Sequence, residues 1–260
     1  MAHPRTTSRS LQARFLADGP LERLPKRPDD REALLRFVAA QVLPAGECDD
    51  EPGLNLRLRR FTEDVAMLRR ALVDHGLVDR AADGSSYAGL VARGEVTVRP
   101  VTAEDDAEVD RLTVAAYLAA GHFPDARSGY MAKVARSAAA RRVEAETWIA
   151  ERDGVAVGAV TLAVAGGAWA DVAAEGELEF RLLVVDPAVQ RSGAGRVMIE
   201  AIVDAARERE GIERVVLTTN ADWDAANAVY PRLGFHRAPE RDWRPADNPQ
   251  IELIVYSITV

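Results

Sequence analysis

The stretch at residues 179–196, EFRLLVVDPAVQRSGAGR, constrains the fold of this chain most, because it places a glycine loop between a strand and a helix. The apolar run at residues 180–185 predicts the strand, and apolar residues at helical spacing after residue 195 predict the helix. Glycines let a backbone approach a ligand closely. The first turn of a helix offers unpaired N–H groups and the positive end of the helix dipole. The stretch therefore predicts a site for phosphate or pyrophosphate.

Composition, together with the cysteine and histidine content, indicates what type of protein contains this site. The 260 residues are 48% hydrophobic and 28% charged, which is ordinary for a globular protein of two domains. The chain lacks both an apolar run of about 18 residues and a secretory signal, so we expect no membrane partner. The single cysteine, Cys48, excludes an intrachain disulfide and fits a cytoplasmic location. The four histidines lie far apart, so we expect no metal site.

Charge is unevenly distributed along the chain. The formal net charge is −8, with 15 Lys and Arg against 14 Asp and Glu in residues 1–94, and 18 against 27 in residues 95–260. The acidic second part argues against broad nucleic-acid binding there and suits a cationic substrate. The nearly neutral first part neither supports nor excludes contact with DNA.

The first part of the chain predicts a flexible start, residues 1–14, followed by a small helical domain at residues 15–92. Three helices followed by a hairpin are the element order of a winged helix. Thr62 is the predicted cap of the third helix, because carboxylates follow it in the first turn. The predicted elements are helices at 31–42, 54–60 and 62–75, and strands at 77–80 and 87–91.

Two segments of this part, FLADGPLERLPKR and RFTEDVAMLRRALVDHGLVDRAADGSSY, resemble a small uncharacterised domain that also occurs at the end of some ArsR-type regulators. The resemblance implies that helix 62–75 is of the recognition type, with Arg69 and Arg70 facing phosphate. The alternative is that both arginines lie on a solvated helix face or pair with nearby carboxylates, while the domain only packs against another.

From residue 95 onward the pattern predicts strands alternating with helices, in the order β-α-α-β-β-β-α-β-α-β-β. A turn at Asp153-Gly154 joins the first hairpin. The predicted strands are 95–101, 146–151, 155–165, 180–185, 215–219 and 250–260, and the predicted helices are 102–120, 128–142, 196–209 and 224–233.

This order resembles the GNAT acetyltransferase fold, over residues 95–260. Residues 190–195, QRSGAG, match that family's coenzyme A loop, Q/R-x-x-G-x-G/A, and they follow a strand ending in VVDP. The later segment NAVYPRLGF, at 227–235, is similar to a second motif of the family. The resemblance implies an α/β (α+β) fold in which a mixed central sheet is flanked by helices, with the winged-helix-like domain before it.

The resemblance also implies acetyl-CoA as the cofactor. The loop would hold its pyrophosphate, and the preceding strand would splay from its neighbour to receive the pantetheine arm. The alternatives are a plain tight turn for the loop and a solvent-facing helix position for the asparagine of the second motif. The implied coenzyme-binding residues are Leu183, Val184, Val185, Gln190, Arg191, Ser192, Gly193, Ala194, Gly195, Arg196 and Asn227.

Two residues are the candidates for catalysis. Tyr230 matches the family's tyrosine that protonates the departing thiolate, and a phenol suits this role because it is neutral near pH 7. Its alternative role is that of a core aromatic. Glu179 falls where several members keep a glutamate base, and a carboxylate there would take the proton of an attacking amine. Its alternatives are a salt bridge with Arg181 or an anchor for the substrate.

The acceptor side is expected near the first two helices of the second part. Glu177 shares a strand face with Glu179, because alternate residues of a strand point the same way. The polar run 237–244 is expected to border this pocket, and the four tryptophans are expected to be packing residues. The candidate acceptor-site residues are Tyr117, His122, Phe123, Tyr130 and Glu177.

The sequence therefore predicts an acetyl-CoA-dependent N-acetyltransferase. It would transfer an acetyl group to a primary amine, on a small molecule or a peptide, by direct attack in a ternary complex. The alternative is a DNA-binding regulator whose second part senses acetyl-CoA or an amine. The sequence leaves open whether the chain forms a homodimer.

Overall fold

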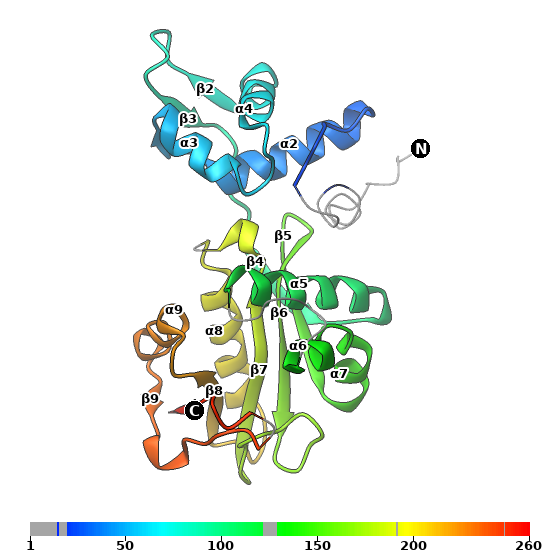
Figure 1. Ribbon diagram of the computed structural model, residues 1–260, viewed down its shortest axis with the longest axis vertical. Coiled ribbons are helices and arrows are strands. Elements are labelled where there is room, and N and C mark those ends of the chain that lie inside the picture. The colour runs from blue at the N-terminus through cyan, green and yellow to red at the C-terminus, as the bar shows by residue number, and fades with distance from the viewer. Residues whose placement is uncertain (1–14, 16–19, 122–128, 191, 247) are drawn as a thin grey trace. The chain divides into compact units, whose positions relative to one another are not determined.

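The computed structural model describes residues 15, 20–121, 129–190, 192–246 and 248–260 (Figure 1). The expected flexible start at 1–14 lies outside these residues. The contacts within the chain define two compact units. The first comprises Met1–Thr97, Glu151–Val157 and Asp186–Ser192, and the second comprises Val98–Ala150, Gly158–Val185 and Gly193–Val260.

The N-terminal part of the first unit has the predicted order of three helices and a hairpin. A short strand that the sequence did not predict, β1, adds a third strand, so that the antiparallel sheet has the order β1-β3-β2. The first helix begins at Pro28, earlier than predicted, because proline suits the first helical turn. The elements are α2 (Pro28–Val42), β1 (Cys48–Asp49), α3 (Glu51–Leu58), α4 (Val65–Asp74), β2 (Val78–Arg80) and β3 (Tyr87–Gly89).

The third helix has a different cap from the predicted one. Asp64 is the N-cap of α4, and its carboxylate accepts a hydrogen bond from the backbone N–H of Met67 at 2.9 Å. The hydroxyl of Thr62 is buried instead and donates to the carbonyl of Leu21 at 2.6 Å. The prediction of Thr62 as the cap was therefore wrong. Its hydroxyl accepts the N–H of Asp64 at 3.1 Å, and the helix begins only at Val65.

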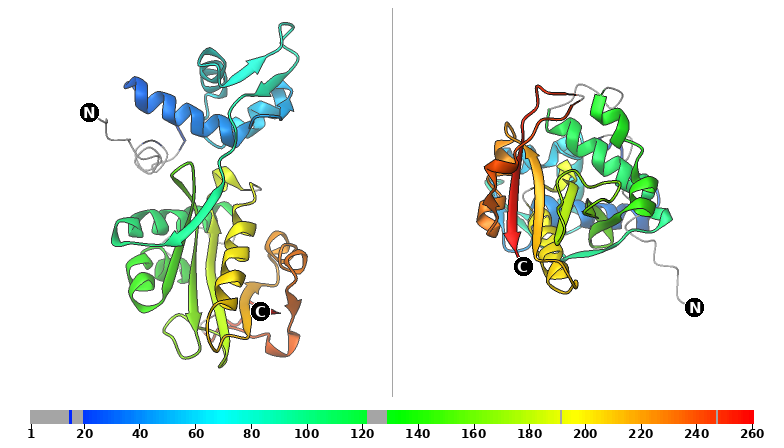
Figure 2. Two further views of the ribbon diagram at one scale, coloured as in Figure 1. Left: turned by 180° about the vertical axis from the view of Figure 1, so that it is seen from behind. Right: turned by 90° about the horizontal axis from the view of Figure 1, so that it is seen from below.

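The remaining strands form one mixed sheet of seven, in the order β4-β5-β6-β7-β8-β10-β9. Helices α5, α6 and α7 cover one face and α8 covers the other (Figure 2). The predicted mixed sheet flanked by helices is confirmed. The strands are β4 (Val96–Pro100), β5 (Glu146–Arg152), β6 (Val155–Val164), β7 (Glu177–Val185), β8 (Arg214–Asn220), β9 (His236–Arg237) and β10 (Leu253–Thr259). The helices are η1 (Ala103–Asp105), α5 (Asp106–Ala119), α6 (Gly129–Val134), α7 (Ala138–Glu144), η2 (Pro187–Val189), α8 (Ala194–Arg207), α9 (Asp224–Asn227), η3 (Tyr230–Leu233) and η4 (Pro239–Arg241).

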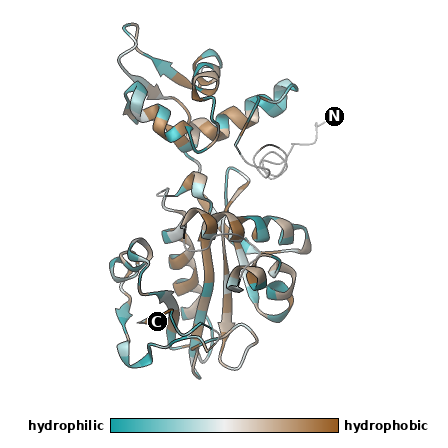
Figure 3. Ribbon diagram, in the orientation of Figure 1, coloured by the Kyte–Doolittle hydropathy of each residue, from teal (hydrophilic) through white to brown (hydrophobic). Residues whose placement is uncertain are grey.

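The core lies where the central strands meet the helices. β6 is buried along nearly its whole length, as expected for a strand covered on both faces. Hydrophobic residues mark β6, β7 and one side of α8 (Figure 3). Met198, Ile199, Ile202 and Val203 form the buried face of α8 and hold this helix against the sheet.

Two predicted helices are each divided in the structure. The helix predicted at 128–142 becomes α6 and α7, because the hydroxyl of Ser137 bonds back to the carbonyl of Val134 at 2.8 Å. Asp110 on α5 then accepts the N–H of Ala138 at 2.9 Å and so caps α7 from a distance. The helix predicted at 224–233 becomes α9 and η3, because Pro231 has no N–H to continue it.

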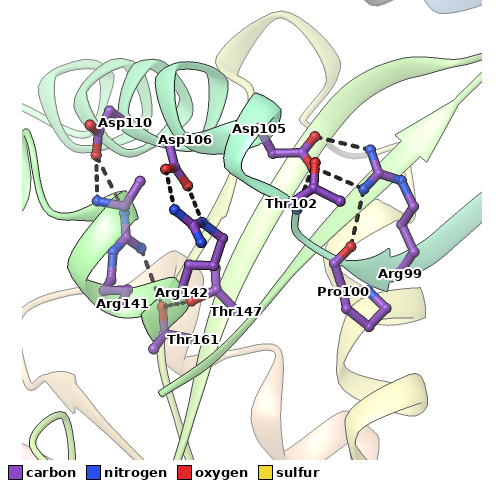
Figure 4. A network of polar contacts seen from close by, with 11 residues as sticks. Arg99, Pro100, Thr102, Asp105, Asp106, Asp110, Arg141, Arg142, Thr147 and Thr161 are labelled. Carbon is purple, nitrogen blue, oxygen red and sulfur yellow. Dashed lines mark hydrogen bonds and ion pairs between the residues drawn. The ribbon is translucent and has the colours of Figure 1, made fainter. Parts of the chain in front are cut away.

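A polar network joins α5 to α7 and to the sheet (Figure 4). Arg142 makes two hydrogen bonds of 2.9 Å to Asp106. Arg141 is fully buried and donates to the hydroxyls of Thr113 and Thr161, at 3.1 and 3.3 Å. A buried charge is tolerated when it is hydrogen-bonded, so this network holds α5 in a fixed place on the sheet.

The buried face of α8 gives a test of the fold. Replacing Ile202, which is fully buried, with alanine removes core packing and should lower the free energy of unfolding by about 2–5 kcal/mol. Urea-induced unfolding of the full chain, followed by circular dichroism, measures the loss. Arg207→Ala is the control, because this exposed side chain on the same helix makes only a surface ion pair and should change stability little. Equal losses in both variants would contradict the assigned face.

Candidate active site

The central feature of the site is the strand β7, which is bulged and paired along only part of one edge. Its register against β6 shifts between Ala159 and Thr161, and Leu182 on β7 has a positive φ of 50°. An extra residue of this kind is a β-bulge, which bends a strand. On its other edge, β7 pairs with β8 from Glu177 to Glu179. No further pairing with β8 occurs in the described residues, so the rest of this edge is open.

The open edge leads directly to the glycine loop. Gly193 adopts a left-handed φ of 86° and α8 begins at the next residue. The first bond of this helix runs from the N–H of Val197 to the carbonyl of Gly193 at 3.1 Å. The amides of Ala194, Gly195 and Arg196 therefore belong to the first helical turn, where N–H groups have no partner within the helix. This is the geometry that the sequence predicted for holding an anion.

The side chains around the loop have various environments. The guanidinium of Arg152, on β5, donates to the carbonyl of Ser192 at 2.8 Å, a contact that the sequence did not predict. Arg196 is exposed and pairs with Glu200 on the next helical turn at 2.8 Å. Gln190 also lies in the described loop, whereas Arg191 lies outside the described residues.

Glu179 is completely buried, and its two carboxylate oxygens have different surroundings. Oε2 accepts three backbone N–H groups, from Asp171, Val172 and Ala173, at 2.9, 2.9 and 3.0 Å. Oε1 accepts no hydrogen bond among the described residues, and the Nε of Arg181 lies 3.7 Å from it. Burial raises the pKa of this carboxyl, while the N–H groups and Arg181 oppose the shift. The ion pair with Arg181, one of the alternatives predicted for Glu179, is thus present, and Oε1 accepts no hydrogen bond among the described residues.

Glu177 is also buried, but its carboxylate is engaged on both sides. It forms a two-pronged ion pair with Arg241 of η4, at 2.8 and 2.7 Å, and accepts the N–H of Ala174 at 2.9 Å. These bonds lower the pKa of Glu177 despite its burial. Its predicted contact with the acceptor stays a prediction, and both of its oxygens already have partners in the structure.

Tyr230 lies in a cluster of aromatic rings at the start of η3. Its ring centroid is 6.2 Å from those of Phe180 and Phe235 and 5.3 Å from that of Tyr256. Burial raises the pKa of its phenol, so the hydroxyl keeps its proton near neutral pH. This environment is compatible with both roles predicted for Tyr230, namely a core aromatic that packs against β7 and a neutral proton donor.

Asn227 has a local structural role. Its side-chain amide donates to the carbonyls of Asn220 and Ala221, at 3.0 and 3.1 Å, and so joins α9 to the end of β8. Its carbonyl oxygen is buried and has no hydrogen-bond partner among the described residues. The helix α9 ends at Asn227, and Tyr230 begins the short helix η3.

Two of the residues predicted to line the acceptor site, Tyr117 and Tyr130, lie in a group of aromatic rings. Tyr117 on α5 lies 6.2 Å from Tyr130 and 5.8 Å from Trp223, centroid to centroid, and the two tyrosine hydroxyls hydrogen-bond each other. Tyr117 also packs against the cluster that contains Leu182, the bulged residue of β7. The structure therefore brings Tyr117 and Tyr130 together, and the sequence had treated Trp223 only as packing. His122 and Phe123 lie outside the described residues.

The two arginines of α4, Arg69 and Arg70, have different surroundings. Arg69 pairs with Glu51 on α3 at 3.0 Å, and Arg70 is exposed. Around them, residues 61–76 carry three carboxylates, on Glu63, Asp64 and Asp74. For Arg69 this is the alternative predicted from the sequence, namely pairing with a nearby carboxylate.

Two features are absent from the described part of the chain. No group of three or more His, Cys, Asp or Glu side chains lies close enough together to hold a metal ion. None of the described helices has the length and apolar character needed to cross a bilayer.

The fold is of mixed α/β architecture, with a bulged central strand that leads into a glycine loop. The profile of the acetyltransferase (GNAT) family matches residues 101–235, about half of the chain, so the chain belongs to this family. A second profile, described as an uncharacterized protein conserved in bacteria (DUF2087), matches residues 20–88. Both predicted resemblances are thereby confirmed.

Several known proteins are similar to parts of the chain. The [ribosomal protein bS18]-alanine N-acetyltransferase of Escherichia coli K12 is 32% identical over 79 residues, which are 30% of this chain and 53% of the relative. The enzyme of the same name from Salmonella typhimurium LT2 gives the same values. The chain thus spans about half the length of the curated relatives it matches.

Two solved structures share the fold. A putative GNAT-family acetyltransferase from Desulfovibrio desulfuricans has a TM-score of 0.51 at 20% identity, covering 64% of this chain and 99% of that chain. The PaiA N-acetyltransferase from Thermoplasma acidophilum, in complex with coenzyme A, has a TM-score of 0.50 at 12% identity, with the same coverage. At these identities the likeness shows the fold alone.

Proposed function

We propose that this chain transfers an acetyl group from acetyl-CoA to a primary amine, by direct attack in a ternary complex. The observation that carries the proposal is the open edge of β7, which has Glu179 at one end and the glycine loop at the other. Such an edge offers backbone groups to an extended ligand, and the loop offers amides to its phosphates. Residues 95–260 are proposed as the transferase domain and residues 15–92 as a separate winged-helix-like domain.

Acetyl-CoA would supply the activated acyl group, and the protein would supply position and proton transfer. The amides at the start of α8 fit a pyrophosphate, because they are free of helical bonds and follow a left-handed glycine. The backbone of β7 would hold the pantetheine arm. The proposed coenzyme-binding residues are Leu183, Val184, Val185, Gln190, Arg191, Ser192, Gly193, Ala194, Gly195, Arg196 and Asn227.

Two proton transfers accompany the exchange of a C–S bond for a C–N bond. Glu179 would accept the amine proton on Oε1, the oxygen that the loop amides leave unused. Its raised pKa makes it a better base than an ordinary carboxylate. Tyr230 would donate its proton to the departing sulfur, since burial keeps its phenol neutral.

The acceptor would lie on the side of Tyr117 and Tyr130, whose rings gather near the bulge of β7. An acceptor that is cationic in solution suits the acidic composition of residues 95–260. The names of the curated relatives point to a protein α-amine on alanine. A peptide with an N-terminal alanine and a small aliphatic polyamine are therefore the first acceptors to compare.

Isothermal titration of the full chain with acetyl-CoA, followed by an acceptor screen, tests the proposal. We expect saturable binding of acetyl-CoA and release of free thiol with at least one amine. A chain that binds no acetyl-CoA would refute the proposal. A chain that binds the coenzyme and acetylates no amine would support the alternative, a regulator that senses acetyl-CoA. An electrophoretic mobility shift with duplex DNA would then test whether the chain binds DNA.

Tyr230→Phe should lower kcat about 100-fold, because it removes the proposed proton donor and keeps the ring packing. Binding of acetyl-CoA should be unchanged, since the phenyl ring still fills its place. Steady-state kinetics and titration with the coenzyme measure the two effects. Tyr256→Phe is the matched control, because it removes a hydroxyl from the same aromatic cluster. The role of Tyr230 would be excluded if both variants kept the wild-type kcat.

A further inference from the structure

The backbone of residues 171–174, between β6 and β7, is held by carboxylates that point out of β7. Four successive N–H groups, from Asp171 to Ala174, donate to them: three to Oε2 of Glu179 and one to Oε2 of Glu177. Charged acceptors make strong hydrogen bonds. The position of this 171–174 segment and the orientation of both carboxylates are therefore set together.

Arg241 fixes the same segment from the other side. This residue, in η4, donates two hydrogen bonds to Glu177 and a third, of 2.7 Å, to the carbonyl of Val172. It thus bonds both to the carboxylate that holds Ala174 and to the backbone of the segment itself. A guanidinium is suited to this task, because its planar fork matches a carboxylate and has a donor to spare.

The consequence is that Glu179 presents a defined oxygen. Oε2 already accepts three hydrogen bonds, whereas Oε1 is buried and accepts none among the described residues. If the 171–174 segment moved, its amides would leave Oε2 and the carboxylate would be free to rotate. Proton transfer requires the base to lie within hydrogen-bonding reach of the proton.

We propose that Arg241 is a positioning residue, which acts through Glu177 and the carbonyl of Val172 to keep Oε1 of Glu179 directed at the acceptor amine. This inference rests on the proposed function, in which Glu179 is the base. Arg241 touches no reacting atom. Its effect would be confined to the proton-transfer step and to the order of the 171–174 segment.

The charges around Glu179 predict the direction in which its pKa changes when Arg241 is removed. Arg181 on β7 and Arg241 on η4 are the cations whose fields reach this carboxylate, and Asp171 and Glu177 are the neighbouring acids. A nearby cation favours the ionised form of a carboxylate. Removing Arg241 should therefore raise the pKa of Glu179 further, and the acidic limb of the pH–rate profile should move to higher pH.

The test compares three variants of the full chain. Arg241→Met removes the fork, and Arg241→Lys keeps a cation and should restore part of the activity. The double variant Glu177→Gln/Arg241→Met removes both charges, so that no buried carboxylate is left unpaired and the fold is retained. Arg207→Met is the control, because Arg207 makes an exposed ion pair with Asp204 on α8, outside the run 237–244.

We expect Arg241→Met and the double variant to lower kcat/KM about 10- to 100-fold, the range for a misplaced catalytic group. Their affinity for acetyl-CoA should stay that of the wild type, and Arg241→Met should show the shifted acidic limb. Hydrogen exchange at the amides of residues 171–174 should accelerate in both. Wild-type kinetics and exchange in the double variant would overturn the inference.

The exchange measurement separates this inference from the proposed function. If the wild type acetylates no amine, the proposed function fails, and faster exchange at 171–174 would show only that Arg241 orders the segment. If the wild type is active and both variants lose coenzyme binding together with activity, Arg241 has a general structural role, and the positioning inference is refuted.

Discussion

Glu179→Gln should lower kcat/KM about 1,000-fold, within the range for removing a general base. Glutamine has nearly the same shape, and its carbonyl oxygen can still accept the three amides that now bond to Oε2. The other oxygen, which is the proposed proton acceptor, becomes an NH₂ group without basicity. Steady-state kinetics with the best acceptor measure the loss, and titration should show unchanged affinity for acetyl-CoA.

The pH dependence of the activity gives a second test of Glu179 as the base. Burial raises the pKa of Glu179, and a base must be ionised to act, so activity should fall as the pH falls through that raised value. In Glu179→Gln this limb should disappear. Glu175→Gln is the control, because Glu175 is an exposed carboxylate in the neighbouring loop. An acidic limb that persists unchanged in Glu179→Gln would assign it to another group and leave Glu179 as an anchor for residues 171–173.

Gly193→Glu should abolish measurable binding of acetyl-CoA, and with it all acetyl transfer. Gly193 has a φ of 86°, a conformation that residues other than glycine rarely adopt, although a Cβ there would meet no neighbour within 4 Å. A carboxylate at this position would also place negative charge where the pyrophosphate is expected. Isothermal titration and the thermal shift caused by the coenzyme measure the loss.

Gly211→Glu is the matched control for the backbone effect. Gly211 follows α8 and has a φ of 79°, and a Cβ there would likewise meet no neighbour within 4 Å. The same substitution there introduces similar strain and the same charge, but away from the glycine loop. It should retain coenzyme binding. Equal loss of binding in both variants, or normal binding in Gly193→Glu, would refute the assignment of the loop.

Several features were predictable because they depend on neighbours in the sequence. Thr102 and Asp105 form the capping box at the start of η1, as an acidic first turn after threonine indicates. The turn Asp153-Gly154 has positive φ at both residues, which explains the hairpin between β5 and β6. The glycine loop and the apolar stripe of α8 were predictable for the same reason.

The predicted cap Thr62 shows where a local pattern was insufficient. Its hydroxyl donates to the carbonyl of Leu21, 41 residues away, and accepts the N–H of Asp64, and Asp64 is the N-cap of α4. No local pattern signals the contact with Leu21. The polar run 237–244 was expected near the acceptor side, but nothing in it distinguishes Arg241 from its neighbouring arginines.

The sequence by itself determined the order of the elements, the glycine loop and the family resemblance, because turn, cap and periodicity signals act over a few residues. Only the tertiary structure decided how the carboxylates of β7 are used. Glu177 and Glu179 look equivalent on one strand face. Glu177 is paired with Arg241, 64 residues later, whereas Glu179 has a buried oxygen that accepts no hydrogen bond among the described residues. Burial and long-range pairing set the pKa and the available lone pairs of a carboxylate, and both depend on what the folded chain brings beside it.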